Sequence, residues 1–259
     1  MGTAARQFFT GAGLLGRGLG LVLSRPRLLG IGILPALISG VLYAAALVSL
    51  IAYIDDVAGG LTWFADDWAS GWRSTLRVFV GLAVLGVAGL LTVLTFTAVT
   101  LLIGDPFYER ISELIEDRFG GVPDAVEVVW WRSLGRSLVD SLRLIALSVL
   151  LGIPLLLIGF IPVVGQVLGL ALGGAVGGWL LAVELTGVPF QRRGRRLHDR
   201  RQVLRAERPL ALGFGVAVFV SFLIPLGAVL LMPAAVAGGT LLARKTLHQP
   251  TEITTTASL

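Results

Sequence analysis

Four long apolar stretches without a charged residue define the organisation of the chain. They comprise residues 28–54, 78–103, 144–183 and 210–243. An α-helix rises about 1.5 Å per residue, and the hydrocarbon core of a bilayer is roughly 30 Å thick. The first two stretches, of 27 and 26 residues, are therefore each long enough for one tilted membrane-spanning helix. The other two, of 40 and 34 residues, are too long for a single span.

Proline and glycine interrupt both of the longer stretches near their middle. The third stretch contains Pro162 and Gly165, and the fourth contains Pro225 and Gly227. Proline removes a backbone donor and glycine permits a turn, so we expect each stretch to fold as a helical hairpin that turns at these residues. Two alternatives stay open: the hairpins enter the bilayer and turn back, or their arms cross it and give six spans in all. A turn at membrane depth needs cover from protein or from a water-filled cavity, so a re-entrant hairpin implies a pore or an oligomer interface.

Two other segments have the pattern of amphipathic helices at the membrane surface. Residues 1–27 are rich in glycine and apolar residues and carry four arginines, which predicts an interfacial helix. Asp105 followed by Pro106 predicts a helix start, because it pairs a capping side chain with proline at the first helical position. That helix either lies at the cytoplasmic interface or continues the second span. Its apolar face holds Phe107, Ile111, Leu114 and Ile115, and its charged face holds Glu109, Arg110, Glu113, Glu116 and Asp117.

The predicted fold class is therefore an all-α integral membrane protein. It has two full transmembrane helices, two helical hairpins broken by proline and glycine, and amphipathic interfacial helices. Residues 1–245 are predicted to form a single membrane domain. Residues 246–259 are polar and rich in threonine, and we expect a disordered tail there.

The distribution of arginine predicts the orientation in the membrane. The loop 55–77 carries two arginines and four aspartates, whereas residues 184–209 carry eight arginines. Because Lys and Arg concentrate on the cytoplasmic side, the loop is predicted to lie outside and both termini in the cytoplasm of a cell-membrane protein. The eight arginines are typical of contact with anionic lipid, and alternatively attract an anion to the mouth of a pathway. Nothing in the fold pattern supports binding to nucleic acid.

Composition excludes several kinds of chemistry. Only 14% of the residues are charged, against about 25% in a typical soluble domain, and there is no cysteine. The two histidines, His198 and His248, both lie in polar segments. No metalloprotease, nucleotide-binding or nucleophile-elbow motif occurs in the sequence. We therefore expect no enzymatic activity, no cofactor and no metal site.

Glycines recur every fourth residue in the second half of the third stretch. Gly165, Gly169, Gly173 and Gly177 share one face of a helix, where small residues allow another backbone to approach closely. This predicts tight helix packing. The packing partner is left open between the same chain, a second protomer and a permeation path.

Five short motifs, in matching order and spacing, give the chain a family resemblance. It resembles the CysZ family of bacterial sulfate permeases, which shares a domain family with the etoposide-induced membrane proteins of eukaryotes. The resemblance implies two transmembrane helices, two hemi-penetrating hairpins, an oligomer, and passage of sulfate into the cytoplasm. The motifs are Ile33-Leu34-Pro35, Asp105-Pro106-Phe107-Tyr108 with Glu113 and Glu116, Phe160 to Gln166, Val188-Pro189-Phe190, and Leu223-Ile224-Pro225 with Met232 to Val236.

At one place the chain departs from the family pattern. The family's sulfate-binding element has paired arginines just before Ile-Leu-Pro, whereas this chain has Leu29 and Gly30 there. The nearest basic residues, Arg25 and Arg27, are therefore the candidate anion-binding residues. Arg110, Glu113 and Glu116 are candidate pathway residues, although a solvated charged face is the other interpretation.

The hypothesis for function is a permease or channel for an inorganic anion, with sulfate as the expected substrate. We expect it to be a homo-oligomer in contact with membrane lipid. The alternative is a membrane scaffold or lipid-organising protein that transports nothing. The missing arginine pair and the apolar stretches without charge favour this alternative.

Overall fold

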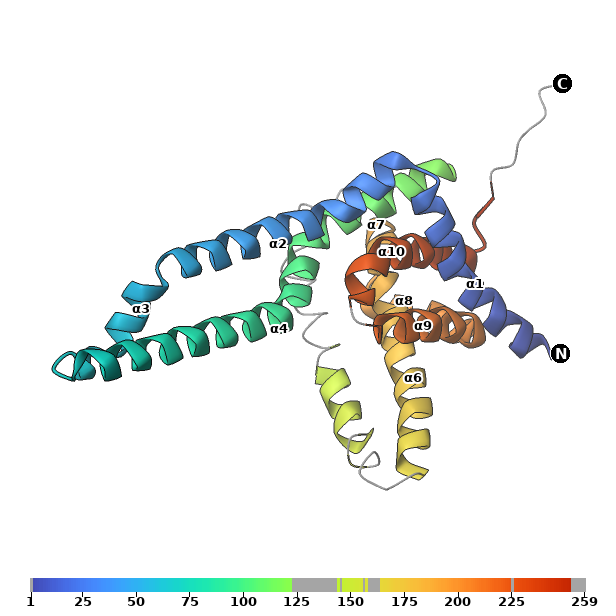
Figure 1. Ribbon diagram of the computed structural model, residues 1–259. Helices are drawn as coiled ribbons and strands as arrows, with labels where there is room; N and C mark the ends of the chain where they lie inside the picture. The colour runs from blue at the N-terminus through green and yellow to red at the C-terminus, as the bar shows by residue number, and fades with distance from the viewer. Residues whose placement is uncertain are drawn as a thin grey trace. The chain divides into compact units, whose positions relative to one another are not determined.

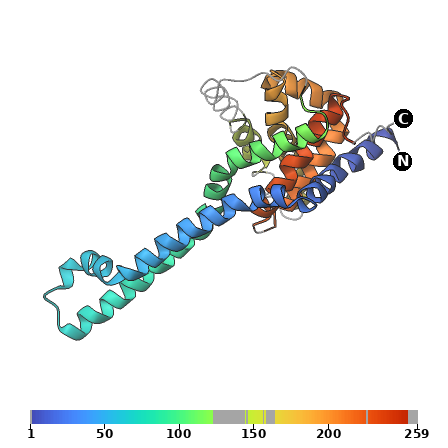
Figure 2. The same cartoon turned by 90° about the horizontal axis from the view of Figure 1, so that it is seen from above.

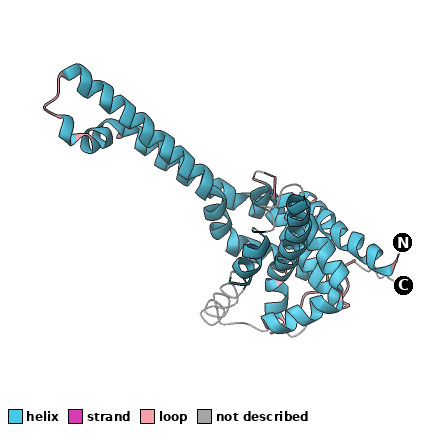
Figure 3. Cartoon of the chain, turned by 90° about the horizontal axis from the view of Figure 1, so that it is seen from below, coloured by secondary structure: helices cyan, strands magenta, loops and turns pink. Residues whose placement is uncertain are grey.

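The computed structural model of the chain is helical. It describes residues 2–122, 144, 146–155, 157, 164–224 and 226–252. Within these ranges every regular element is a helix and no strand occurs (Figure 3). The predicted all-α fold is therefore confirmed.

The helices divide between two compact units. The hairpin unit is Ile33–Asp105, and the bundle unit is Met1–Gly32 with Pro106–Leu259. The elements, labelled in Figure 1 where there is room, are α1 (Thr3–Leu23), α2 (Pro26–Ala52), α3 (Ile54–Leu61), the 3-10 turn η1 (Trp63–Ala65), α4 (Ser70–Arg118), α6 (Val164–Leu185), α7 (Gly187–Arg192), α8 (Leu197–Ala206), α9 (Arg208–Phe222) and α10 (Gly227–Thr246).

Two long apolar helices run antiparallel in the hairpin unit. Figure 1 shows α2 and α4 running in opposite directions, connected at one end through α3, and Figure 2 shows the same helices from above. Between them the Tyr43 hydroxyl lies 2.6 Å from Oγ1 of Thr95, within hydrogen-bond distance. The most apolar windows of α2 and α4 have mean hydropathies of 2.2 and 2.4, yet only 17% and 6% of their residues are buried inside the protein. Helices this long and this exposed suit a lipid environment, so both predicted spans are present as helices.

The second predicted span extends further than its apolar stretch. α4 is one continuous helix from Ser70 to Arg118, with Pro106 inside it. The amphipathic helix predicted to start at Asp105 is therefore the continuation of the second span, which was one of the two alternatives. Its charged end belongs to the bundle unit.

The bundle unit is built around α9 and α10. Helix α1 packs against both of them, and α6 packs against α9 (Figure 1). Helix α10 is apolar enough to cross a membrane, but 78% of its most apolar window is buried inside the protein. Much of its apolar surface is therefore used for packing between helices.

Glycines bring the backbones of these helices into direct contact. A methyl group built on Gly213 of α9 would lie 1.9 Å from the carbonyl oxygen of Phe8 in α1. A methyl group on Gly215 would lie 1.8 Å from the carbonyl oxygen of Gly178 in α6. No side chain fits at such distances, so both interfaces require glycine.

The fourth apolar stretch folds as the predicted hairpin. Helix α9 ends at Phe222 and α10 begins at Gly227. Leu226, in the turn, has a left-handed φ of 61°, and a methyl group on Gly227 would lie 2.2 Å from the carbonyl oxygen of Ser221. Pro225 lies outside the described residues.

The two arms of this hairpin differ in length. Helix α9 has 15 residues, which span about 22 Å, less than the thickness of a bilayer core. Helix α10 has 20 residues because it continues past the apolar stretch to Thr246. The extra length of α10 comes partly from residues beyond the uncharged stretch, which ends at Ala243.

The third stretch is described mainly through α6. This helix begins at Val164, so Gly165 lies in its first turn, while Pro162 lies outside the described residues. Two glycines of the predicted face differ in their surroundings. A methyl group on Gly177 would lie 2.6 Å from the Phe219 ring, whereas one on Gly173 would meet no described atom within 4 Å. Gly169 is half-buried. The packing partner of this face as a whole stays a prediction.

The contrast between two of these glycines yields a test of the fold. Gly215→Ala places a methyl group against the α6 backbone, and such overpacking costs about 1–3 kcal/mol. Gly173→Ala adds the same group where nothing opposes it, and alanine is favoured in a helix by up to about 1 kcal/mol. We expect the thermal unfolding midpoint of the detergent-purified protein to fall for Gly215→Ala and to hold or rise for Gly173→Ala. Equal midpoints would contradict the α6–α9 contact.

Candidate functional site

A fully buried carboxylate is the centre of the bundle unit. Glu116, in the last turn of α4, has no exposed surface. Both of its oxygens are bonded to Arg193, at the end of α7: Oε1 lies 2.6 Å from Nη1 and Oε2 lies 2.9 Å from Nη2. Arg244, in the last turn of α10, donates from Nη1 to Oε2 at 2.5 Å. We call these three residues the Glu116 centre. Arg193 and Arg244 follow Glu116 by 77 and 128 residues in the sequence.

The Glu116 centre has one more positive charge than negative. Its two guanidinium groups share a single carboxylate, and the arginine side chains are only 8% and 3% exposed. Buried charge is expensive unless it is paired and fully hydrogen-bonded. Something besides Glu116 must therefore stabilise the second arginine.

Backbone carbonyls at the ends of two helices, α4 and α7, supply that stabilisation. Carbonyl oxygens of Phe119 and Gly121, just beyond α4, accept hydrogen bonds from Arg244, the second at 3.0 Å. The carbonyl of Pro189 in α7 accepts one from Arg193 at 2.8 Å. Carbonyl-rich helix C-termini carry partial negative charge, which favours cations there. The surplus charge is thus balanced by dipoles rather than by a second carboxylate.

The sequence at the end of α4 explains how these carbonyls are presented. Gly120 and Gly121 have left-handed φ angles of 97° and 72°, and the Gly121 amide donates to the Glu116 carbonyl at 2.9 Å. This is a Schellman-type ending, in which glycine lets the chain reverse direction. The Phe119 ring also lies beside Arg244, with its centroid 5.7 Å from the guanidinium carbon, which adds a cation–π contact.

A buried pair of hydroxyls positions α4 against α10. Oγ of Ser112 lies 2.8 Å from Oγ1 of Thr240, and both side chains have no exposed surface. Ser112 is about one turn before Glu116, and Thr240 about one turn before Arg244. The hydrogen bond therefore fixes the register in which the carboxylate meets the arginine.

The predicted pathway residues fall into two groups. Glu116 belongs to the buried centre. Arg110 and Glu113 pair with each other at 2.5 Å, with side chains 50% and 29% exposed. Such a partly solvated pair contributes little to stability. Whether any of the three lines a pathway stays a prediction.

The predicted anion-binding residues lie at the start of α2, Arg25 just before it and Arg27 in its first turn. Arg25 and Arg27 are both exposed, on either side of Pro26, the first residue of α2. Within the described ranges, neither side chain forms an ion pair. Exposed unpaired arginines can attract an anion, but they lack the desolvated surroundings of the Glu116 centre.

Sequence reasoning did not single out the two arginines of the centre. Arg193 is one of eight arginines in residues 184–209, and Arg244 is the first charge after the fourth stretch. The arginines of residues 184–209 are predicted as a group to contact anionic lipid or to attract an anion, and Arg244 counts only toward the membrane orientation. One feature of the sequence does indicate that Arg244 is buried. It directly follows a long apolar stretch, which other helices can cover.

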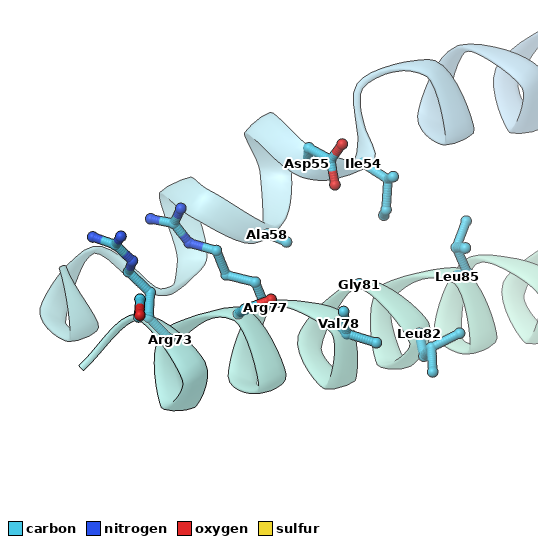
Figure 4. Close-up of a pocket in the computed structure, with 11 residues that line it drawn as sticks. Ile54, Asp55, Ala58, Arg73, Arg77, Val78, Gly81, Leu82 and Leu85 are labelled. Atoms are coloured by element: carbon cyan, nitrogen blue, oxygen red, sulfur yellow. The ribbon is translucent and has the colours of Figure 1, made fainter. Parts of the chain in front are cut away.

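The hairpin unit contains a separate cavity of about 510 Å³ between α3 and α4. Arg73 and Arg77 reach from α4 toward α3, which contributes Asp55 to the opposite wall (Figure 4). Arg77 also pairs with Asp66 at 2.7 Å, and Arg73 donates to the Asp66 carbonyl at 3.0 Å. Two arginines here face two aspartates, so this cavity has no surplus of positive charge. The Glu116 centre is the better candidate for handling an anion.

Metal binding receives no support from the described residues. No group of three or more His, Asp or Glu side chains in them is placed to hold an ion.

Comparison with known proteins decides the family. A family model described as Sulfate transporter CysZ/Etoposide-induced protein 2.4 matches residues 14–233. The chain belongs to this family. The resemblance drawn from the five sequence motifs is thereby confirmed, and the family model spans Glu116 and Arg193.

Individual relatives agree with this assignment. A protein of Vibrio cholerae serotype O1 named sulfate transporter CysZ is 29% identical over 255 residues, covering 93% of this chain and 96% of the relative. A protein of Pseudomonas aeruginosa with the same name is 30% identical over 173 residues, covering 66% of this chain and 70% of the relative. Together with the long apolar helices, these relatives identify a membrane protein.

Two glutamates one turn apart provide a test of the centre. Glu116→Gln leaves two buried arginines without their shared anion, and breaking a buried pair costs about 3–5 kcal/mol. Glu113→Gln, the matched control, breaks a partly exposed pair worth about 0–1 kcal/mol. We expect a large fall in the thermal unfolding midpoint, or loss of the monodisperse peak in size-exclusion chromatography, for Glu116→Gln alone. Similar behaviour of both variants would show that the buried pairing is not a major source of stability.

Proposed function

We propose that the protein is a membrane permease that carries sulfate into the cytoplasm. The observation that carries this proposal is the buried Glu116 centre, where two arginines share one carboxylate. A surplus of positive charge at a desolvated position is what an anion pathway needs. The relatives named sulfate transporters indicate which anion it is.

The chemistry of the centre fits a tetrahedral oxyanion. Sulfate carries two negative charges and four acceptor oxygens, and guanidinium groups bind such anions through short charge-assisted hydrogen bonds. A permease must also release what it binds. Glu116 serves this need, because its carboxylate competes with sulfate for the same donors of Arg193 and Arg244.

The orientation follows from the charge distribution. The loop 55–77, poor in arginine, lies outside, and both termini lie in the cytoplasm of a multi-pass protein of the cell membrane. The segment 184–209, which contains Arg193, then lies on the cytoplasmic side. In this orientation the Glu116 centre is near the cytoplasmic exit of the pathway.

A homo-oligomer completes the proposal. Helices α2 and α4 leave most of their apolar surface exposed. Lipid covers part of this surface, and a second protomer packs on the rest. Arg25 and Arg27 concentrate sulfate at the membrane interface. No step of this function requires enzymatic chemistry.

Uptake of radiolabelled sulfate into proteoliposomes tests the proposal. We expect uptake faster than in empty vesicles, and a reduction of about 10- to 100-fold in Arg193→Gln, since a hydrogen bond to a charged group contributes about 1.5–3 kcal/mol. Arg25→Ala with Arg27→Ala should lower uptake by a few fold, mostly at low salt, because their effect is attraction at a distance. Arg205→Ala, on the exposed side of α8, is the control and should leave uptake unchanged. Uptake equal to that of empty vesicles would refute the permease and favour the scaffold.

A further inference from the structure

The segment after α10 folds back over the Glu116 centre. We call residues 247–252 the C-terminal strap. His248 has a left-handed φ of 55°, and the amide of Gln249 donates to the Arg244 carbonyl at 2.8 Å, so the chain reverses direction at the helix end. Sequence alone predicted a disordered tail from Thr246 onward. Residues 253–259 lie outside the described part of the chain, whereas the strap makes defined contacts.

The strap gives one neutral oxygen to each buried arginine. Oε1 of Gln249 accepts a hydrogen bond from Nη2 of Arg193 at 2.5 Å. The carbonyl oxygen of Pro250 accepts one from Nε of Arg244 at 2.8 Å. These two acceptors come from adjacent residues and satisfy two different guanidinium groups.

Removing the strap would turn the centre into an unfilled oxyanion site. Nη2 of Arg193 would keep only Glu116 as partner, and Nε of Arg244 would lose its acceptor. Nε of Arg193 is buried and already has no hydrogen-bond partner. Two guanidinium groups, mostly buried and with a net positive charge, would then present unfilled donors.

We propose that these donors form a binding site for a tetrahedral oxyanion, and that the strap is a displaceable plug in it. Gln249 and Pro250 place neutral oxygens where two oxygens of the anion would bind. The inference rests on the proposed function for the choice of sulfate as ligand. It adds that the strap must leave before the anion binds, so the strap restrains transport.

The strap is suited to leaving. None of its residues is buried, and it contains no regular helix. Its far end is held by Arg17 of α1, which donates to the Thr251 carbonyl at 3.0 Å and lies 3.7 Å from the Glu252 carboxylate. The side chains of that ion pair are 41% and 84% exposed, so the pair is weak and screened by salt. Opening would cost few contacts and would uncover two arginines.

Two truncated chains separate the strap from the rest of the tail. A chain ending at His248 lacks residues 249–259 and so loses the strap's contacts to the side chains of Arg17, Arg193 and Arg244. A chain ending at Glu252 keeps the strap and lacks only residues 253–259, which makes it the matched control. Binding of radiolabelled sulfate to the purified protein and uptake into proteoliposomes are both measured for each chain.

We expect the chain ending at His248 to bind sulfate about tenfold more tightly than the full chain and to transport it faster, because one or two charge-assisted bonds become available. The chain ending at Glu252 should match the full chain. If the full chain transports sulfate, but removal of the strap leaves sulfate binding unchanged or makes it weaker, the plug is overturned. Tighter binding without uptake by any of the three chains would support the plug and refute the permease.

Should the shorter chain fail to fold, two substitutions act on the intact chain. Gln249→Ala frees Nη2 of Arg193, and Arg17→Gln releases the far end of the strap. In both variants sulfate should raise the thermal unfolding midpoint more than it does in the unmodified protein, while chloride at equal ionic strength should not. No added effect of sulfate in either variant would contradict the plug.

Discussion

The bundle depends on one carboxylate shared by two buried arginines. Glu116 has no exposed surface, and its oxygens join the ends of three helices, α4, α7 and α10. A single glutamate cannot neutralise two guanidinium groups, so the remaining charge is balanced by carbonyls at the helix ends. In our proposal, stability and affinity for anions arise from the same three side chains.

The packing around this centre keeps it dry and in register. Glycine contacts bring α1 and α6 against α9, and the Ser112–Thr240 hydrogen bond aligns α4 with α10. Much of the apolar length of α10 is used inside the protein, whereas α2 and α4 expose theirs. The chain thus combines a hairpin unit of exposed apolar helices with a bundle unit whose interior holds charge.

The sequence predicts the helices better than it predicts the site. Runs without charge and the proline–glycine breaks depend on local pattern, and they identified the two long apolar helices and the turn between α9 and α10. Glu116 lies on the charged face of the helix predicted after Asp105, and it also belongs to a family motif. The pairing of Arg193 and Arg244 with Glu116 was missed because the partner is 77 and 128 residues away in the sequence. No local pattern distinguishes a buried arginine from one that only sets the orientation in the membrane. The strap was missed for a similar reason, since its composition is polar and its contacts are distant.

The most direct test of the account removes all three charges together, with Glu116→Gln, Arg193→Met and Arg244→Met in one chain. Replacing a complete buried ion cluster with uncharged groups of similar size is often neutral or stabilising, whereas breaking it is not. The account predicts that this triple variant unfolds at a higher temperature than Glu116→Gln alone and takes up sulfate no faster than empty vesicles. A stable triple variant that still transports sulfate at the unmodified rate would show that the centre is structural only.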